Sequence, residues 1–126
     1  MKKLIALCAV TLLAVSATAS EYANISINDL EKAIKSGKVA VIDVNGTKSY
    51  ANGHIPGAID FDKVSDDLKS KLPADKDRLI VAYCANPECP AYKYGADAAK
   101  KLGYTNIKHL SAGISGWRAA GKKIEQ

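Results

Sequence analysis

Two cysteines, Cys84 and Cys89, are the residues of this sequence best suited to nucleophilic chemistry. A thiol reacts as its thiolate, so a reactive cysteine needs surroundings that favour negative charge on sulfur. Cys84 directly follows the apolar run Leu79–Tyr83 and precedes a helical pattern that starts at Tyr92. A loop that turns from a strand into a helix points backbone N–H groups inward, and the helix N-terminus adds positive partial charge.

We therefore predict that Cys84 is a nucleophile and that the loop after it forms a ring of amides around the sulfur. The loop residues are Ala85, Asn86, Pro87, Glu88, Cys89 and Pro90. A structural thiol buried at the end of a strand is the alternative, because unreactive cysteines are often simply buried.

The cysteine and histidine residues do not favour a metal site. A pair of cysteines separated by four residues, with only His54 and His109 elsewhere, is a poor ligand set for zinc. We predict no metal and no cofactor.

Apolar runs and helical periodicity alternate along the chain and predict an α/β fold. The expected strands are Val39–Val44, Leu79–Tyr83 and Ile107–Leu110. The expected helices are Asp29–Lys35, Tyr92–Leu102 and Ile114–Ala120. Continuous apolar strands are typical of a parallel sheet covered on both faces, and functional groups in such sheets collect beyond the carboxyl ends of the strands.

The first of these helices has boundary signals of its own. Asn28 is expected to be its N-cap, with Glu31 closing a capping box, and Gly37 is expected to end it.

The N-terminal segment is typical of a cleavable secretory signal. Met1-Lys2-Lys3 is basic, Leu4–Val15 contains eleven apolar residues and one Thr, and Ala17-Thr18-Ala19 offers the small-residue pattern of a cleavage site. A spanning helix needs about 20 apolar residues, so a retained anchor is disfavoured. We predict a leader at 1–19, one domain at 20–126, and a protein located in the periplasm or secreted.

The charge pattern limits the range of partners. The net charge is +5, but the lysines are scattered among acidic residues rather than arranged as a basic stripe with aromatics. Nucleic-acid binding is therefore not expected, and neither is membrane association after signal cleavage.

The sequence resembles the rhodanese domains, a sulfurtransferase family. The motifs that carry the resemblance are, in chain order, Val41–Val44 (VIDV), Tyr50, Gly53–Ile59 (GHIPGAI), Tyr83-Cys84, Gly103–Ile107 (GYTNI), Leu110–Gly113 (LSAG), Trp117 and Gly121. They extend from about Ile25 to Glu125, essentially the whole predicted domain.

This resemblance implies a five-stranded, mostly parallel sheet with helices on both faces. It also implies a reaction in which Cys84 attacks a sulfane sulfur donor, becomes a persulfide and passes the sulfur to a nucleophile. The implied donors are polysulfide, persulfide or thiosulfate, and the implied acceptors are a thiol or cyanide.

The other motif residues are interpreted as structural. His54 is expected to be a hydrogen-bonding structural histidine, because a lone His without a matched partner is weak evidence for acid–base catalysis. Asp43 is expected to tie loops together by accepting backbone hydrogen bonds. Trp117 is expected in the core, and His109 on the surface or in a loop.

The loop after Cys84 departs from the usual rhodanese pattern. Cys89 and Pro90 stand where the family places an Arg and then a Ser or Thr, and the loop contains no Arg. Phosphate esters are normally held by such an Arg, so phosphatase activity is not expected. Thiosulfate is likewise a less suitable donor, with Lys93 as the candidate substrate-binding cation.

Cys89 introduces a second thiol. If the two Cα atoms lie within about 7 Å, Cys89 can form a disulfide with Cys84. It would then resolve a persulfide with release of sulfide, or protect the thiolate from over-oxidation. The alternative is that the two sulfurs never meet.

Three functions remain open from the sequence. The first is a sulfurtransferase or persulfide carrier that uses Cys84. The second is a thiol–disulfide redox protein that uses the Cys84/Cys89 pair. The third is a non-catalytic module that keeps the fold, since a fold alone does not establish a function.

Overall fold

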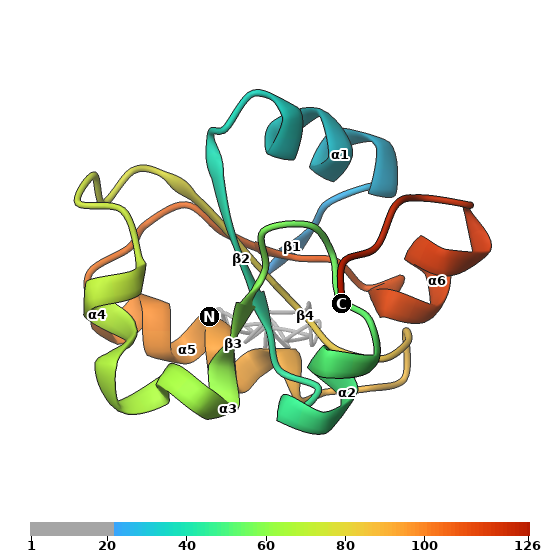
Figure 1. Cartoon of the computed structure of the whole chain (residues 1–126). Helices are drawn as coiled ribbons and strands as arrows, with labels where there is room; N and C mark the ends of the chain where they lie inside the picture. Colours follow the sequence, from blue (N-terminus) through green and yellow to red (C-terminus); the bar gives the residue numbers. More distant parts are fainter. Residues whose placement is uncertain (1–21) are drawn as a thin grey trace, which may run out of the picture.

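A five-stranded sheet forms the centre of the computed structural model, which describes residues 22–126 (Figure 1). Its strands are β1 (Ala23–Asn24), β2 (Val39–Asp43), β3 (Ile59–Asp60), β4 (Leu79–Tyr83) and β5 (Ile107–His109). The order across the sheet is β1-β5-β4-β2-β3, and all four pairings are parallel. The predicted fold class is confirmed, whereas the predicted leader at 1–19 lies outside the described residues.

Helices cover both faces of this sheet (Figure 1). One face carries α1 (Ile27–Lys35), α2 (Thr47–Asn52) and α6 (Gly113–Ala119). The other carries α3 (Phe61–Val64), the 3-10 turn η1 (Ser65–Asp67), α4 (Leu68–Lys71) and α5 (Tyr92–Lys101). Within residues 22–126, none of these helices combines the length and apolar character needed to cross a bilayer.

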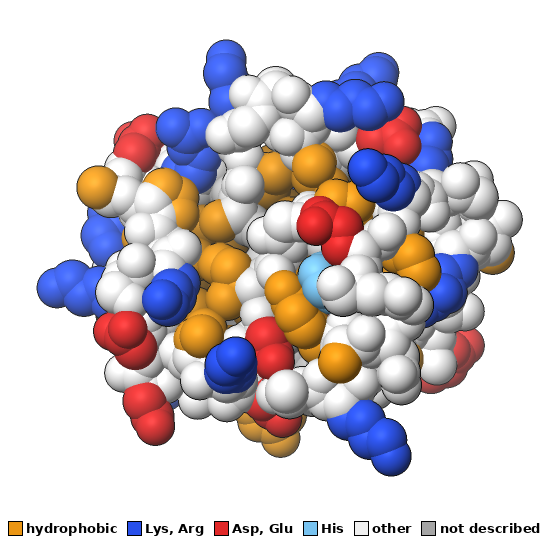
Figure 2. Space-filling model, in the orientation of Figure 1, with side chains coloured by type: hydrophobic (Ala, Val, Ile, Leu, Met, Phe, Trp, Pro, Cys, Tyr) orange, Lys and Arg blue, Asp and Glu red, His pale blue; other side chains and the backbone are white. Residues whose placement is uncertain are grey.

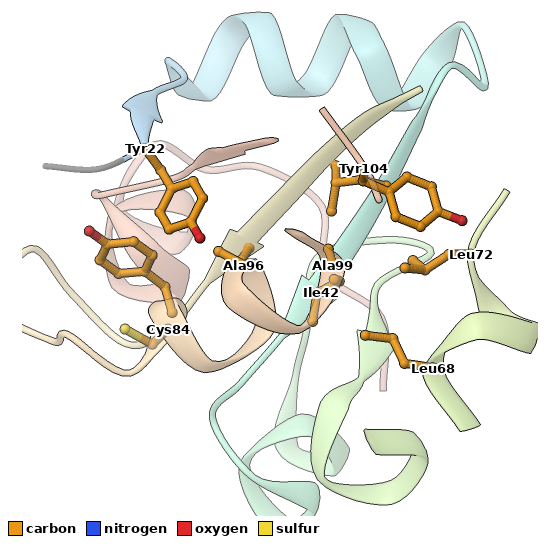
Figure 3. Packing of buried hydrophobic residues seen from close by; sticks show 11 residues of the cluster. Tyr22, Ile42, Leu68, Leu72, Cys84, Ala96, Ala99 and Tyr104 are labelled. Atoms are coloured by element: carbon orange, nitrogen blue, oxygen red, sulfur yellow. The ribbon is translucent and has the colours of Figure 1, made fainter. Parts of the chain in front are cut away.

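Helices on both faces of the sheet explain why the central strands are continuous apolar runs in the sequence. Successive side chains of a strand point to opposite faces, so Ile80 and Ala82 pack under α5 while Val81 and Tyr83 pack under α1 and α6. Figure 3 shows the cluster under α5, with Ala96 and Ala99 close to Ile42 and with Cys84 at one end. Burial on both faces therefore favours apolar residues at every strand position.

Helix α1 begins two residues earlier than predicted. Ser26 is the N-cap, and its hydroxyl oxygen accepts a hydrogen bond of 3.1 Å from the backbone N–H of Asp29. The proposed Asn28 cap and Glu31 capping box are therefore wrong, because both residues lie inside the helix. Gly37 follows the helix with φ +69° and donates its N–H to the carbonyl of Ile34, as expected for a helix end.

Candidate functional site

Cys84 lies immediately beyond the carboxyl end of β4, where the start of α6 holds its loop in place. The backbone N–H of Ile114 donates to the carbonyl of Cys84 at 3.0 Å, and that of Ser115 donates to the carbonyl of Ala85 at 2.9 Å. Gly113 allows this contact: its φ is +64°, and a Cβ there would lie 2.5 Å from the carbonyl carbon of Ala85. Only glycine fits that position, a role that sequence reasoning missed.

Cys84 and Cys89 are joined by a disulfide, with their Cα atoms 6.2 Å apart. The alternative in which the two sulfurs never meet is therefore wrong for this state. Cys84 is only 3% exposed, while Cys89 is partly exposed. The closed loop thus shields Cys84 from solvent and leaves Cys89 as the accessible member of the pair.

The loop does not form the predicted ring of amides in this closed state. Asn86 takes two of the N–H groups: that of Glu88 donates to its side-chain oxygen at 3.1 Å, and that of Cys89 to its carbonyl at 3.2 Å. Pro87 and Pro90 have no N–H to offer. The side chain and the backbone carbonyl of Asn86 each accept one amide that the predicted ring would use in this disulfide-bonded state. The ring around a reduced Cys84 thiolate therefore stays a prediction.

The sulfur of Cys84 instead lies 3.0 Å from the carbonyl oxygen of Cys89. A carbonyl oxygen accepts a hydrogen bond from a thiol but repels a thiolate. The reduced loop must therefore rearrange before it can stabilise negative charge on Cys84.

A buried hydrogen-bonded chain lies next to this site, at the same edge of the sheet. Asp43, at the end of β2, accepts hydrogen bonds from the Tyr83 hydroxyl at 2.6 Å and from the backbone N–H of Asn45 at 2.7 Å. The Tyr83 hydroxyl in turn accepts from the backbone N–H of Ile55 at 3.0 Å. The expectation that Asp43 ties loops together is confirmed.

The same chain shifts the protonation of both side chains. Burial raises the pKa of Asp43, and the hydrogen bond from Tyr83 partly opposes that shift. Burial also raises the pKa of Tyr83, with the Asp43 charge adding to the effect. Tyr83 therefore stays protonated and acts as a fixed donor.

A family model, described as the rhodanese-like domain, matches residues 26–120. The chain belongs to the rhodanese-like domain family. Its fold is of the sulfurtransferase type, as the resemblance implied.

Three individual proteins are similar to this rhodanese-like domain. The HTH-type transcriptional regulator Rv0324 of Mycobacterium tuberculosis is 34% identical over 73% of this chain, which spans only 40% of that regulator's length. The thiosulfate sulfurtransferase GlpE of Shewanella oneidensis is 28% identical over 80% of this chain and 97% of its own. The BH2092 protein of Bacillus halodurans superposes with a TM-score of 0.68 and 31% identity, covering 82% of this chain and 76% of that one.

His109 of the rhodanese-like domain is buried, so its predicted place on the surface or in a loop is wrong. It is the last residue of β5, where it pairs with Ala82 of β4 and Asn24 of β1. Its ring stacks on that of Tyr92 with centroids 4.2 Å apart. Burial, and then the charge of Lys93, lowers the pKa of His109.

The alternation of β5 was the signal that could have found this histidine. Ile107 and His109 are two residues apart in a strand and so point to the same face, which α5 covers. His109 thereby supports Tyr92, the first residue of the helix that follows the cysteine loop.

Lys93, the predicted substrate-binding cation, lies exposed on the first turn of α5. With Pro90, Ala91, Tyr94 and Asp97 it lines an open cavity of about 530 Å³ beside the loop. Lys93 therefore lies on the helix that directly follows the cysteine loop, beside Pro90.

His54 of the rhodanese-like domain connects the Gly53–Ile59 motif to the C-terminal residues. Its Nδ1 lies 2.8 Å from the Tyr50 carbonyl, which fixes the proton on that nitrogen because a carbonyl can only accept. Its ring stacks on Tyr50 at 3.6 Å, and its backbone forms a two-bond bridge with Glu125. The structural interpretation of His54 is confirmed, as is that of Trp117, which is 2% exposed.

Proposed function

We propose that this rhodanese-like protein is a periplasmic sulfurtransferase or persulfide carrier, in which Cys84 accepts sulfane sulfur and passes it to a thiol. The observation that supports this most strongly is the position of Cys84. It lies directly beyond the carboxyl end of β4 and forms a disulfide with Cys89, with the two Cα atoms 6.2 Å apart. The similarity to a thiosulfate sulfurtransferase over nearly the whole of both chains gives independent support.

The reaction begins from the reduced pair. The Cys84 thiolate attacks the outer sulfur of a donor persulfide. A new S–S bond forms at Sγ, the S–S bond of the donor breaks, and the donor leaves as a thiol that carries the proton. An acceptor thiolate then attacks the terminal sulfur and regenerates Cys84.

Cys89 provides a second outcome for the bound sulfur. Its thiolate attacks Sγ of Cys84, the disulfide forms, and the terminal sulfur leaves as hydrosulfide. A dithiol reductant must then supply two electrons before the next cycle. The disulfide in the structure has the form expected after this step. Cys84 has no thiolate in that form and is only 3% exposed, so the pair must be reduced before a sulfur donor can react with it.

We favour polysulfide or a persulfide over thiosulfate as the donor. Thiosulfate carries two negative charges, and bidentate Arg contacts are the usual way to hold such a group. The loop has no Arg, Glu88 adds negative charge, and Asn86 occupies two of its amides. Lys93 is the cation placed nearest to the loop along the chain.

Intact-mass analysis of the reduced protein after exposure to polysulfide tests the proposal. Wild-type protein gains one sulfur transiently and ends as the disulfide, Cys89→Ser retains the added sulfur, and Cys84→Ser gains none. Addition of sulfur to Cys84→Ser but not to Cys89→Ser would show that Cys84 is not the acceptor and refute the assignment.

The disulfide also favours a second candidate, a thiol–disulfide exchange protein. This function requires a midpoint potential near those of exchange catalysts, whereas structural disulfides resist reduction by glutathione. Redox titration of the pair against glutathione buffers separates the candidates when combined with the sulfur-addition assay. A midpoint potential near those of exchange catalysts, together with no sulfur added to Cys84, would support the redox function.

The proposal also includes export of the protein to the periplasm. It rests on the basic start, the short apolar run and the small-residue pattern of residues 1–19. N-terminal sequencing of the protein recovered from the periplasmic fraction should begin at Ser20. Recovery of the uncleaved chain from the cytoplasm would refute this part.

A further inference from the structure

An open cavity of about 660 Å³ lies beside β3, the strand at one side of the sheet, and neither Cys84 nor Cys89 is among its lining residues. Figure 2 shows this face of the molecule, with apolar side chains in the hollow and charged ones around it. Residues that line the cavity include Tyr50, His54, Ile59, Asp60, Lys63 and Lys71. The volume lies in the range of small-molecule sites.

Asp60 is the unusual group in this cavity. It is the last residue of β3 and only 7% exposed, and its Oδ1 is buried without a hydrogen-bond partner among residues 22–126. In the sheet it stands directly opposite Asp43, another buried acid. A buried carboxylate oxygen without a hydrogen bond is costly, so a ligand that brings a hydrogen-bond donor or a positive charge to the Asp60 carboxylate would stabilise this site.

The wall beside Asp60 is formed by the stacked rings of Tyr50 and His54. The Tyr50 hydroxyl donates to the Ala58 carbonyl at 2.6 Å, which fixes the ring. The pKa of Tyr50 is raised by burial first and by the negative charge of Asp60 second. The charge of Asp60 therefore acts on this part of the cavity, next to an apolar surface.

Two lysines supply positive charge to the same cavity. Lys63 and Lys71 both line the cavity and are exposed, and neither forms an ion pair within the described part of the chain. A ligand that reaches from Asp60 to these lysines must carry a cation at one end and an anion at the other.

We propose that this cavity binds a small zwitterion of the amino-acid class, with its ammonium group on Asp60 and its carboxylate on Lys63 and Lys71. An apolar side chain of the ligand would lie against Ile59 and the Tyr50 ring. This site makes no use of Cys84 and does not depend on the sulfur-transfer proposal.

Titration followed by amide NMR, with three matched probes, tests the proposal. The probes are L-leucine, isoamylamine, which keeps only the ammonium group, and 4-methylpentanoate, which keeps only the carboxylate. Leucine should shift the signals of the lining residues at lower concentration than either single-charge probe. Absence of saturable shifts with leucine, or equal binding of all three probes, would overturn the proposal.

Variants assign the two charges separately. Asp60→Asn should weaken leucine and isoamylamine binding by about tenfold or more, and Lys63→Gln/Lys71→Gln should weaken leucine but not isoamylamine. Lys69→Gln, an exposed lysine on the same helix as Lys71 that does not line the cavity, is the matched control and should change nothing.

Two results would refute the assignment in the variants. One is unchanged leucine binding in Asp60→Asn, and the other is an equal loss in Lys69→Gln. If Asp60→Asn fails to fold, the comparison of the three probes on wild-type protein still decides the proposal.

Discussion

Tyr83 connects segments that are far apart in the sequence, because its hydroxyl both donates to Asp43 and accepts from the Ile55 backbone. It is the last residue of β4 and immediately precedes Cys84. At the scale of single residues, the cysteine loop is therefore anchored by a fully buried hydrogen-bonded chain. Loss of one partner in such a chain leaves the others unsatisfied.

Tyr83→Phe keeps the ring but removes the hydroxyl, leaving one oxygen of Asp43 and the N–H of Ile55 without this partner. We expect the free energy of unfolding to fall by about 3 kcal/mol, because each buried group left unsatisfied costs about 1–3 kcal/mol. Urea unfolding monitored by circular dichroism measures the change. Tyr94→Phe removes a hydroxyl from a side chain that is 72% exposed and should be nearly neutral. Equal effects of the two substitutions would contradict the role of Tyr83.

His109 makes stability depend on pH in the weakly acidic range. Its native pKa is lowered, chiefly by burial, so between that value and the ordinary value near 6.5 the unfolded chain binds more protons than the native state. The free energy of unfolding should therefore decrease as the pH falls through this window. Urea unfolding of wild type and His109→Gln from about pH 7.5 to about pH 5.5 should show a steeper decline in wild type. Parallel curves would show that His109 does not contribute.

At the scale of elements, the cysteine loop is held between two helices that approach the sheet closely. Gly95 lets α5 lie against β2, since a Cβ there would come within 2.9 Å of the Ile42 side chain. Gly113 does the same for the start of α6 and the loop backbone. The geometry of the disulfide thus depends on how tightly these helices pack.

Gly113→Ala should destabilise the protein and loosen the loop. The added Cβ would meet the backbone of Ala85 and Asn86 at 2.5–2.7 Å, in addition to the unfavourable positive φ. We expect a loss of about 3 kcal/mol and faster reduction of the Cys84–Cys89 disulfide by a dithiol.

Gly37→Ala is the matched control, because its φ of +69° is similar and nothing lies within 4 Å of the added Cβ. It should cost only about 1–2 kcal/mol, the penalty of the backbone conformation, and leave the reduction rate unchanged. If both variants accelerate reduction equally, the contact of Gly113 with the loop is not the cause.

At the scale of the whole molecule, the central strands and the longer helices could be predicted because their patterns are local and strong. Val39–Asp43 and Leu79–Tyr83 are buried on both faces, so an apolar run reveals them directly. The two-residue strands β1 and β3 have no such signal, since pairing with β5 and β2 defines them. Sequence pattern could not reveal them.

The candidate site also contains features that the sequence predicts and features that only the folded structure reveals. The place of Cys84 at a strand end was predictable, and so was the reach of Cys89 to it. The partners of the loop amides were not, because one amide bonds to the Asn86 side chain and another to its backbone carbonyl, an arrangement that depends on the conformation of the whole loop. The burial of His109 was missed, although strand alternation places it on the same face as Ile107. A three-residue strand with a lysine at its centre gives little indication that it is buried.

The last residues of the chain close the molecule on the face that carries α1 and α6. Glu125 pairs with the His54 backbone and accepts from Gly57 with its side chain, and Lys122 bonds to Glu31 of α1 at 3.1 Å. The buried indole of Trp117 donates to the Lys123 carbonyl at 2.8 Å. This tail therefore joins three parts of the fold that are separate in sequence.

Deletion of residues 122–126 should lower the free energy of unfolding by about 3–5 kcal/mol. The loss combines two backbone hydrogen bonds at His54, a buried Trp117 N–H without its acceptor, and the partly buried Ile124 side chain. Urea unfolding followed by Trp117 fluorescence measures the change, because the indole becomes exposed to solvent. Deletion of Gln126 alone removes only an exposed side-chain contact to Asn52 and should be nearly neutral, which makes it the control. If the longer deletion were equally neutral, the contacts of the tail would not contribute to the stability of the domain.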